Sequence, residues 1–124
     1  MGDYELCHII RFESARRLTR VPEGHPCGRL YGLAFYLEIH VVGDLGPTTG
    51  WVVDFGDIEQ AVAPLRADLD HNYLNDLEGL ENPTSEVLVT WIWHRLKPRL
   101  PALSQLVLRE NEVSKVIYRG PRAS

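Results

Sequence analysis

The chain has 124 residues with 44% hydrophobic and 24% charged side chains, which fits one globular domain spanning residues 1–124. Thirteen basic against 17 acidic residues give a net charge of −4, so the basic surface that binds nucleic acid or an anionic membrane is not expected. No apolar run reaches the roughly 18 residues of a membrane span.

The first half of the chain predicts two strands separated by a loop. Residues 3–12 alternate imperfectly between apolar and polar side chains, which indicates an opening strand. Residues 13–30 contain closely spaced prolines and glycines and predict a long loop. Residues 31–43 are rich in aromatic and β-branched side chains, which is typical of a long strand.

A helix is expected after this second strand. Residues 58–69 carry apolar side chains at helical spacing, and Asp54 or Asp57 can cap the helix. Pro64 lies inside this run and predicts a kink or an interruption.

The last third of the chain predicts a second helix and a hairpin. Thr84 is a candidate helix cap. Trp91 and Trp93 are two positions apart and cannot share a helix face, so we expect Trp91 in the core and Trp93 partly exposed. Residues 104–110 and 113–119 predict two strands that pair as a hairpin.

The order strand, strand, helix, helix, strand, strand favours an α+β fold, with a four-stranded antiparallel sheet and two helices on one face. A small open sheet leaves two strand edges unpaired, and such edges invite association. We therefore expect a homo-oligomer.

The number of cysteines and the residues at the start of the chain indicate the cellular compartment in which the protein is expected. Cys7 and Cys27 are the only cysteines and do not make a disulfide framework, which favours a reducing cytoplasm. The charged side chains in residues 1–11 are unlike a secretory signal.

Six local strings, in order along the chain, carry a family resemblance. They are VPEGHPCGRL (21–30), TGWVVDF (49–55), LDHNYLND (69–76), LENPTSEVL (80–88), the strand that ends at Glu110, and IYRG (117–120). Together they resemble the 6-pyruvoyl/6-carboxytetrahydropterin synthase family, and most of all its bacterial 6-carboxytetrahydropterin synthases.

The resemblance implies the tunnelling fold, in which the sheets of several subunits join into a barrel, in a trimer or a hexamer. It also implies active sites between subunits and a small-molecule substrate, dihydroneopterin triphosphate. In the family, zinc polarises the substrate side chain, a cysteine and a His–Asp pair move protons, and a glutamate anchors the pterin ring.

Carried over by position, the resemblance makes Cys27, Asp70 and His71 the proton-transfer residues and Glu110 the ring anchor. All four residue types are present.

The three zinc histidines of the family fall on Arg16, Tyr31 and Leu33. Arginine cannot lose its proton, leucine has no donor atom and tyrosine is a poor zinc ligand. The sequence therefore predicts no metal and no other cofactor. Tyr31 and Leu33 are two apart on a predicted strand and face the same side, so we expect them to line the substrate pocket. Arg16 either joins them there or forms a surface ion pair with Glu13 or Glu38.

Three functions fit this pattern. The main hypothesis is a metal-independent ring-forming enzyme that folds a fairly apolar substrate in an inter-subunit pocket, since proximity alone can contribute roughly 7–11 kcal/mol. The alternative is a 6-carboxytetrahydropterin synthase-type lyase acting on dihydroneopterin triphosphate. A further alternative is a non-catalytic subunit that mixes with an intact paralogue.

Overall fold

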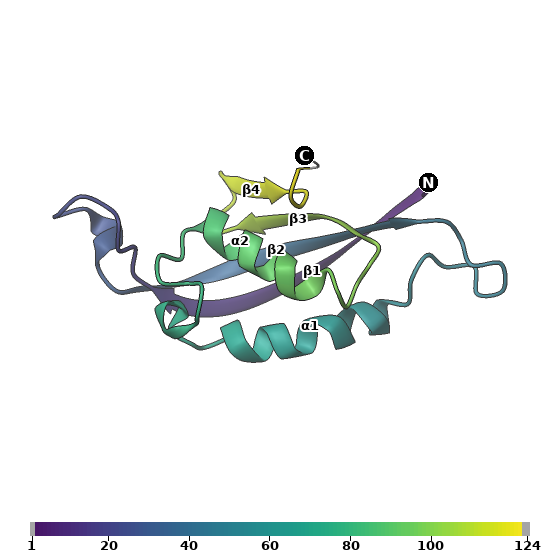
Figure 1. Ribbon diagram of the computed structural model, residues 1–124, viewed down its shortest axis with the longest axis horizontal. Coiled ribbons are helices and arrows are strands. Elements are labelled where there is room, and N and C mark those ends of the chain that lie inside the picture. The colour runs from purple at the N-terminus through teal and green to yellow at the C-terminus, as the bar shows by residue number, and fades with distance from the viewer. Residues whose placement is uncertain (1, 123–124) are drawn as a thin grey trace.

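The computed structural model describes residues 2–122 and confirms the α+β architecture (Figure 1). The elements along the chain are β1 (Tyr4–Arg16), β2 (Tyr31–Gly43), α1 (Phe55–Leu69), α2 (Ser85–Leu96), β3 (Leu103–Arg109) and β4 (Lys115–Tyr118). Two single turns of 3-10 helix lie at Pro26–Gly28 and Leu74–Asp76.

The sheet is antiparallel throughout, in the order β1-β2-β3-β4. Its longest ladder joins β1 to β2, from the pair Tyr4–Gly43 to the pair Arg16–Tyr31. The first strand therefore ends four residues later than the sequence predicted, and the loop begins after Arg16. Residues 13–16 stay extended because β2 offers a partner for each of them, which their polar character does not reveal.

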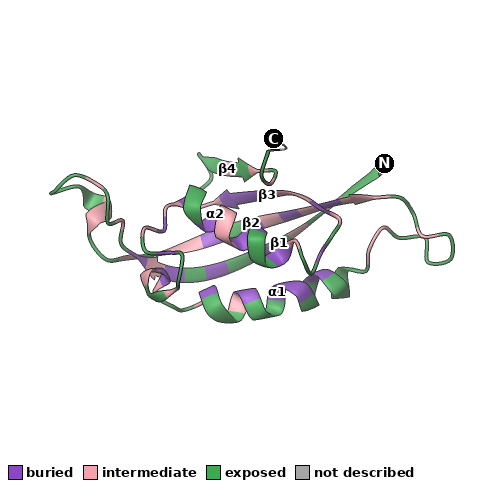
Figure 2. Ribbon diagram, viewed as in Figure 1, coloured by how far each residue is buried: buried purple, intermediate pink, exposed green. Residues whose placement is uncertain are grey.

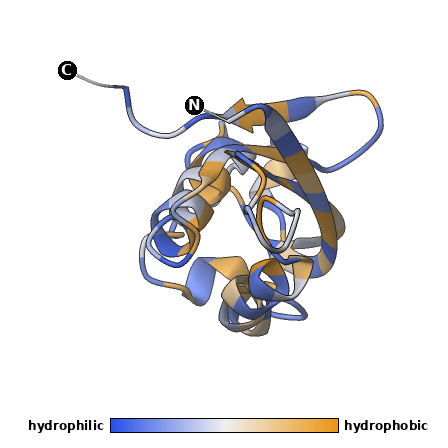
Figure 3. Ribbon diagram, turned by 90° about the vertical axis from the view of Figure 1, so that its right-hand side faces the viewer, coloured by the Kyte–Doolittle hydropathy of each residue, from blue (hydrophilic) through white to orange (hydrophobic). Residues whose placement is uncertain are grey.

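The two helices cover one face of the sheet, and Figure 3 shows the strands curving around them. Asp54 caps α1 by accepting a hydrogen bond from Gly56 N at 2.9 Å, and Thr84 caps α2 by accepting one from Val87 N at 3.1 Å. The helix α1 runs through Pro64 as one element, so the expected interruption does not occur. Within residues 2–122, the helices lack the length and apolarity that a membrane crossing requires.

The core lies between the helices and the inner face of the sheet, where buried residues alternate along β1 and β2 (Figure 2). Phe12 and Phe35 stack there with ring centroids 5.1 Å apart. Ile9, Tyr36 and Ile117 are exposed on the opposite face of the sheet. These apolar side chains support the expected association through the sheet without fixing the number of subunits.

The two tryptophans of α2 are arranged opposite to the prediction. Trp93 is 6% exposed and meets Tyr118 edge to face at 5.6 Å, whereas Trp91 is only partly buried and has Arg95 over its ring. The prediction was wrong because the chain end after β4 covers α2 on the Trp93 side. Helical periodicity carries no information about such a distant segment.

Gly120 packs against Trp93 of α2, so a substitution there tests how much this contact contributes to stability. Its φ is +87°, and an added Cβ would lie 2.5 Å from the Trp93 ring. Gly120→Ala should lower the free energy of unfolding by about 2–4 kcal/mol, through left-handed strain and a clash in a packed core. Gly24 has a similar φ of +84° with open space around it, so Gly24→Ala should show the strain alone, about 1–2 kcal/mol. Equal losses in urea denaturation would contradict the packing role of Gly120.

Candidate active site

Arg16, the last residue of β1, lies at the centre of a buried hydrogen-bond network. Its side chain is only 4% exposed, and Nε donates to the Tyr31 hydroxyl at 2.8 Å across the β1–β2 ladder. Nη1 donates to the Pro83 carbonyl at 3.1 Å and to the Ser85 hydroxyl at 3.4 Å. Nη2 forms an ion pair with the Glu110 carboxylate. Every nitrogen of the buried cation thus has a partner, as burial of a charge requires.

Glu110 directly follows β3 and is also hydrogen-bonded to the first residue of α2. Its Oε1 pairs with Arg16, and its Oε2 accepts a hydrogen bond from the Ser85 hydroxyl at 2.8 Å. The side chain remains 34% exposed, so the carboxylate is held from behind and reaches solvent in front. The expected surface pairing of Arg16 with Glu13 or Glu38 is wrong. Arg16 faces the core, while both of those carboxylates lie on the opposite face of the sheet.

Tyr31 and Cys27 adjoin this network. Burial raises the pKa of the Tyr31 phenol, the hydrogen bond and charge of Arg16 lower it, and the neighbouring Cys27 thiol raises it again. Cys27 sits in the 3-10 turn, where its N–H donates to His25 Nδ1 at 3.0 Å and its carbonyl accepts from Leu18 N at 2.9 Å. The long loop thereby returns the thiol to the end of β1.

Asp70 and His71 form a second group beside the edge of β1. Asp70 Oδ1 accepts a hydrogen bond from Glu13 N at 2.9 Å and lies 3.1 Å from His71 Nδ1. The backbone N–H of His71 donates to the Glu13 carbonyl, and the residue adopts a φ of +59°. The imidazole is 74% exposed. The backbone thus fixes the pair, while the ring points outward.

A surface cavity of about 530 Å³ adjoins this pair and includes His71, Leu33 and Glu13 in its lining. Leu33 therefore lines a surface cavity, whereas Tyr31, two positions away on the strand, belongs to the Arg16 network. They share the inner face of β2, two positions apart, so the two groups lie at the same end of the β1–β2 ladder.

One chain accordingly brings Cys27, Tyr31, Arg16 and Glu110 together, and brings Asp70 and His71 together with Leu33. The sequence analysis missed Ser85 and the Pro83 carbonyl. Both lie in the string LENPTSEVL, whose cap residue Thr84 marked only the start of a helix.

The residues at the implied zinc position do not fit a zinc ion. Arg16 places a permanent positive charge there, the Tyr31 oxygen already accepts a hydrogen bond from that cation, and Leu33 offers no donor atom. A divalent cation would meet charge repulsion instead of a ligand set.

The sequence is similar to those of known proteins over most of its length. The family model described as 6-pyruvoyl tetrahydropterin synthase matches residues 5–121. A 6-carboxy-5,6,7,8-tetrahydropterin synthase of Synechocystis is 39% identical over 119 residues, covering 91% of each chain. The Bacillus subtilis protein of the same name is 27% identical over 128 residues, covering 94% of this chain and 85% of the other. A dihydroneopterin monophosphate aldolase of Pyrococcus furiosus is 36% identical over 72 residues, which cover 58% of this chain and 60% of the relative.

The fold has matching solved structures. The 6-pyruvoyl tetrahydropterin synthase of Caenorhabditis elegans superposes with a TM-score of 0.87 at 19% identity, covering 95% of this chain and 96% of that one. The Plasmodium falciparum enzyme superposes with a TM-score of 0.71 at 15% identity, covering 95% and 98%. At such identities the likeness concerns the fold alone.

The Asp70 contacts predict a particular acid sensitivity. The hydrogen bond from Glu13 N lowers the pKa of Asp70, and His71 lowers it further. A carboxyl whose pKa is lowered by folding stabilises the protein above its unfolded pKa of about 3.9, and this stabilisation is lost as the pH falls through the lower folded value. Asp70→Asn should therefore lose less stability than the wild type as the pH is lowered through this window. Asp68→Asn, at an exposed site on the same helix, serves as control. Acid denaturation curves of the same shape for Asp70→Asn and wild type would contradict the assignment.

Proposed function

Because this chain belongs to the 6-pyruvoyl tetrahydropterin synthase family, we propose that it is a lyase that cleaves the side chain of a dihydropterin substrate by proton transfer, without zinc at the position of Arg16. Relatives named 6-carboxytetrahydropterin synthase match nearly the whole chain and support this function. The ring-forming reaction that the sequence favoured receives no support from these relatives.

The Glu110 carboxylate carries the proposal. A carboxylate has about four lone-pair positions, of which Arg16 and Ser85 use two from behind. Two positions remain on the exposed side of this group, which is paired with a buried cation. The pyrimidine edge of a pterin presents neighbouring N–H donors, and a fixed carboxylate binds such a pair in two parallel hydrogen bonds.

Proton transfer falls to His71 and Cys27. Asp70 faces His71 Nδ1 at 3.1 Å, which leaves Nε2 as the basic nitrogen of the ring. Nε2 takes the hydroxyl proton of the substrate side chain, the carbon–carbon bond breaks, and its electron pair moves into the C=N bond of the pterin ring. Cys27 then returns a proton to the ring side, and the proton on His71 restores the thiol.

Tyr31 takes part of the role that a metal has in the family. Its oxygen accepts a hydrogen bond from Arg16, so its own O–H is free to donate to a substrate oxygen. A hydroxyl that accepts from a cation is a stronger donor in a dry site. Lewis-acid stabilisation by a metal amounts to several kcal/mol, and one such hydrogen bond replaces only part of it, so we expect slow turnover.

The exposed His71 indicates that the site is shared between subunits. Its ring is exposed, whereas Cys27, Tyr31 and Glu110 lie in a separate group, in which His25 is the imidazole next to Cys27. We propose that His71 of one subunit faces the Cys27 set of another in a homo-oligomer. The exposed apolar residues on the outer sheet face fit such an assembly.

A ring-forming enzyme is the second candidate, and one observation favours it. Leu33 makes the wall of the cavity beside His71 more apolar than a histidine would. Such a pocket suits a flexible apolar substrate better than a triphosphate.

The test is turnover of dihydroneopterin triphosphate by protein treated with a chelator. Wild-type protein should release the cleaved side chain, and Glu110→Gln should weaken substrate binding at least tenfold because an amide presents one acceptor oxygen instead of two. Glu112→Gln changes an exposed carboxylate two positions away and should leave turnover unchanged. Absence of any turnover in folded, oligomeric wild-type protein would overturn the lyase proposal and favour the ring-forming candidate.

A further inference from the structure

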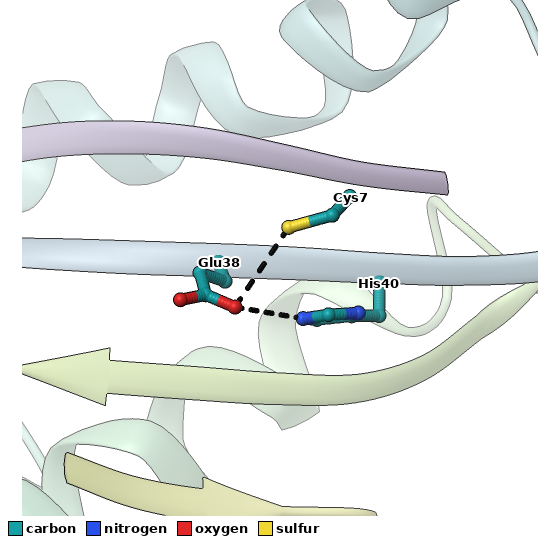
Figure 4. A group of neighbouring side chains, drawn as sticks. All are labelled: Cys7, Glu38 and His40. Carbon is teal, nitrogen blue, oxygen red and sulfur yellow. Dashed lines mark hydrogen bonds and ion pairs between the residues drawn. The ribbon is translucent and has the colours of Figure 1, made fainter. Parts of the chain in front are cut away.

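Cys7, Glu38 and His40 meet on the outer face of the β1–β2 ladder, opposite the helices (Figure 4). We propose that they bind a divalent transition-metal ion of the zinc type. One ligand atom from each residue lies within 4.8 Å of the other two. The pairing of Cys7 with His40 in the ladder brings these residues together from 33 positions apart.

The spacing of the ligand atoms is close to that of a tetrahedral zinc site. Cys7 Sγ lies 3.8 Å from Glu38 Oε1, and Glu38 Oε1 lies 3.0 Å from His40 Nε2. Zinc bonds of about 2.0 Å to nitrogen or oxygen and 2.3 Å to sulfur place neighbouring ligand atoms about 3.3–3.8 Å apart. Small rotations of the exposed Cys7 side chain and of the half-buried Glu38 and His40 side chains would close the set around an ion.

The histidine is oriented as a ligating histidine should be. Its Nδ1 is buried and lacks a hydrogen-bond partner among the described residues, yet it lies 3.3 Å from Glu5 Oε1, outside hydrogen-bond geometry. A metal on Nε2 would leave the proton on Nδ1, facing this carboxylate. A carboxylate behind the second ring nitrogen is the usual support of a metal-bound imidazole. The Ser104 hydroxyl also donates to the His40 carbonyl at 3.1 Å and fixes the strand.

Charge favours a cation here too. Glu38 Oε2 lies 4.0 Å from Arg109 Nε, which leaves Oε1 turned toward the cluster. The Glu38 carboxylate also lies beside Cys7 and His40, and the Glu5 carboxylate lies 3.3 Å from His40 Nδ1. A divalent ion would neutralise these same negative groups, displace the thiol proton and bind the thiolate.

The donor set selects the class of metal. One thiolate, one imidazole and one carboxylate suit zinc or its cobalt analogue, whereas magnesium and calcium prefer oxygen ligands alone. Three protein ligands leave a fourth position for water.

This site is separate from the proposed active site. The pair Cys7–His40 and the pair Arg16–Tyr31 are nine residues apart along the ladder, roughly 30 Å of strand at about 3.3 Å per residue. The two groups also lie on opposite faces of the sheet. Metal binding at Cys7 therefore neither replaces the lost family zinc nor depends on the proposed lyase reaction.

The experiment is a titration of chelator-treated full-length protein with zinc, and then with cobalt(II). Wild-type protein should bind about one ion per chain, and cobalt should produce a thiolate-to-metal charge-transfer band. Cys7→Ser should abolish the band, and both Cys7→Ser and His40→Ala should weaken zinc binding at least tenfold.

Two controls keep the assignment specific. Cys27→Ser retains Cys7 and should keep the cobalt band, and His8→Ala removes a histidine on the opposite face of β1 and should bind zinc like the wild type. Circular dichroism of each variant shows whether it is folded. Absence of zinc binding by the wild type would overturn the proposal, as would a band that survives Cys7→Ser and disappears in Cys27→Ser.

Discussion

A guanidinium cannot lose its proton, so a fold that buries Arg16 must surround it with acceptors. The acceptors come from three places: the Tyr31 hydroxyl at the start of β2, the Pro83 carbonyl and the Ser85 hydroxyl at the start of α2, and the Glu110 carboxylate after β3. This one side chain thereby fixes the relative positions of three strands and a helix at one end of the sheet. The residues that we assign to substrate binding are the same residues that satisfy the buried charge.

The same network changes what the family scaffold can do chemically. A metal coordinates substrate oxygens directly, whereas a guanidinium donates hydrogen bonds, and here each of its three nitrogens already donates within the protein. In the proposed reaction, electrostatic stabilisation therefore arrives indirectly, through the Tyr31 hydroxyl that accepts a hydrogen bond from Arg16 and through the Glu110 carboxylate that pairs with Arg16. The superposition on the Caenorhabditis elegans enzyme at 19% identity shows how far the sequence can change while the fold persists.

The sequence predicted helices and strands correctly where their formation depends on neighbouring residues. The caps at Asp54 and Thr84 and the second strand from residue 31 to 43 needed only neighbouring residues, and the structure has them. The extension of β1 to Arg16, the burial of Trp93 and the hydroxyl of Ser85 on Glu110 depend on partners far along the chain. No pattern within one segment contains that information.

The family resemblance had a different limit, because it assigned residues to roles without saying how the replacing residues contact one another. It placed Arg16 at a position where the resemblance implies a zinc ligand, but the ion pair with Glu110 required coordinates. Cys7 and His40 belong to none of the strings that carried the resemblance, and only the register of β1 on β2 brings them together.

The two faces of the β1–β2 ladder thus hold two chemically different sites. Even positions of β1 point toward the helices and end at Arg16, whereas odd positions point outward and include Cys7. Loss of ligands on the inner face says nothing about ligands on the outer one, since a strand reverses its side chains at each residue. Total zinc content would therefore be a misleading guide to mechanism in this protein. A chain with one zinc bound at Cys7, Glu38 and His40 would resemble a zinc lyase in an elemental assay while its proposed active site holds a guanidinium in place of the metal.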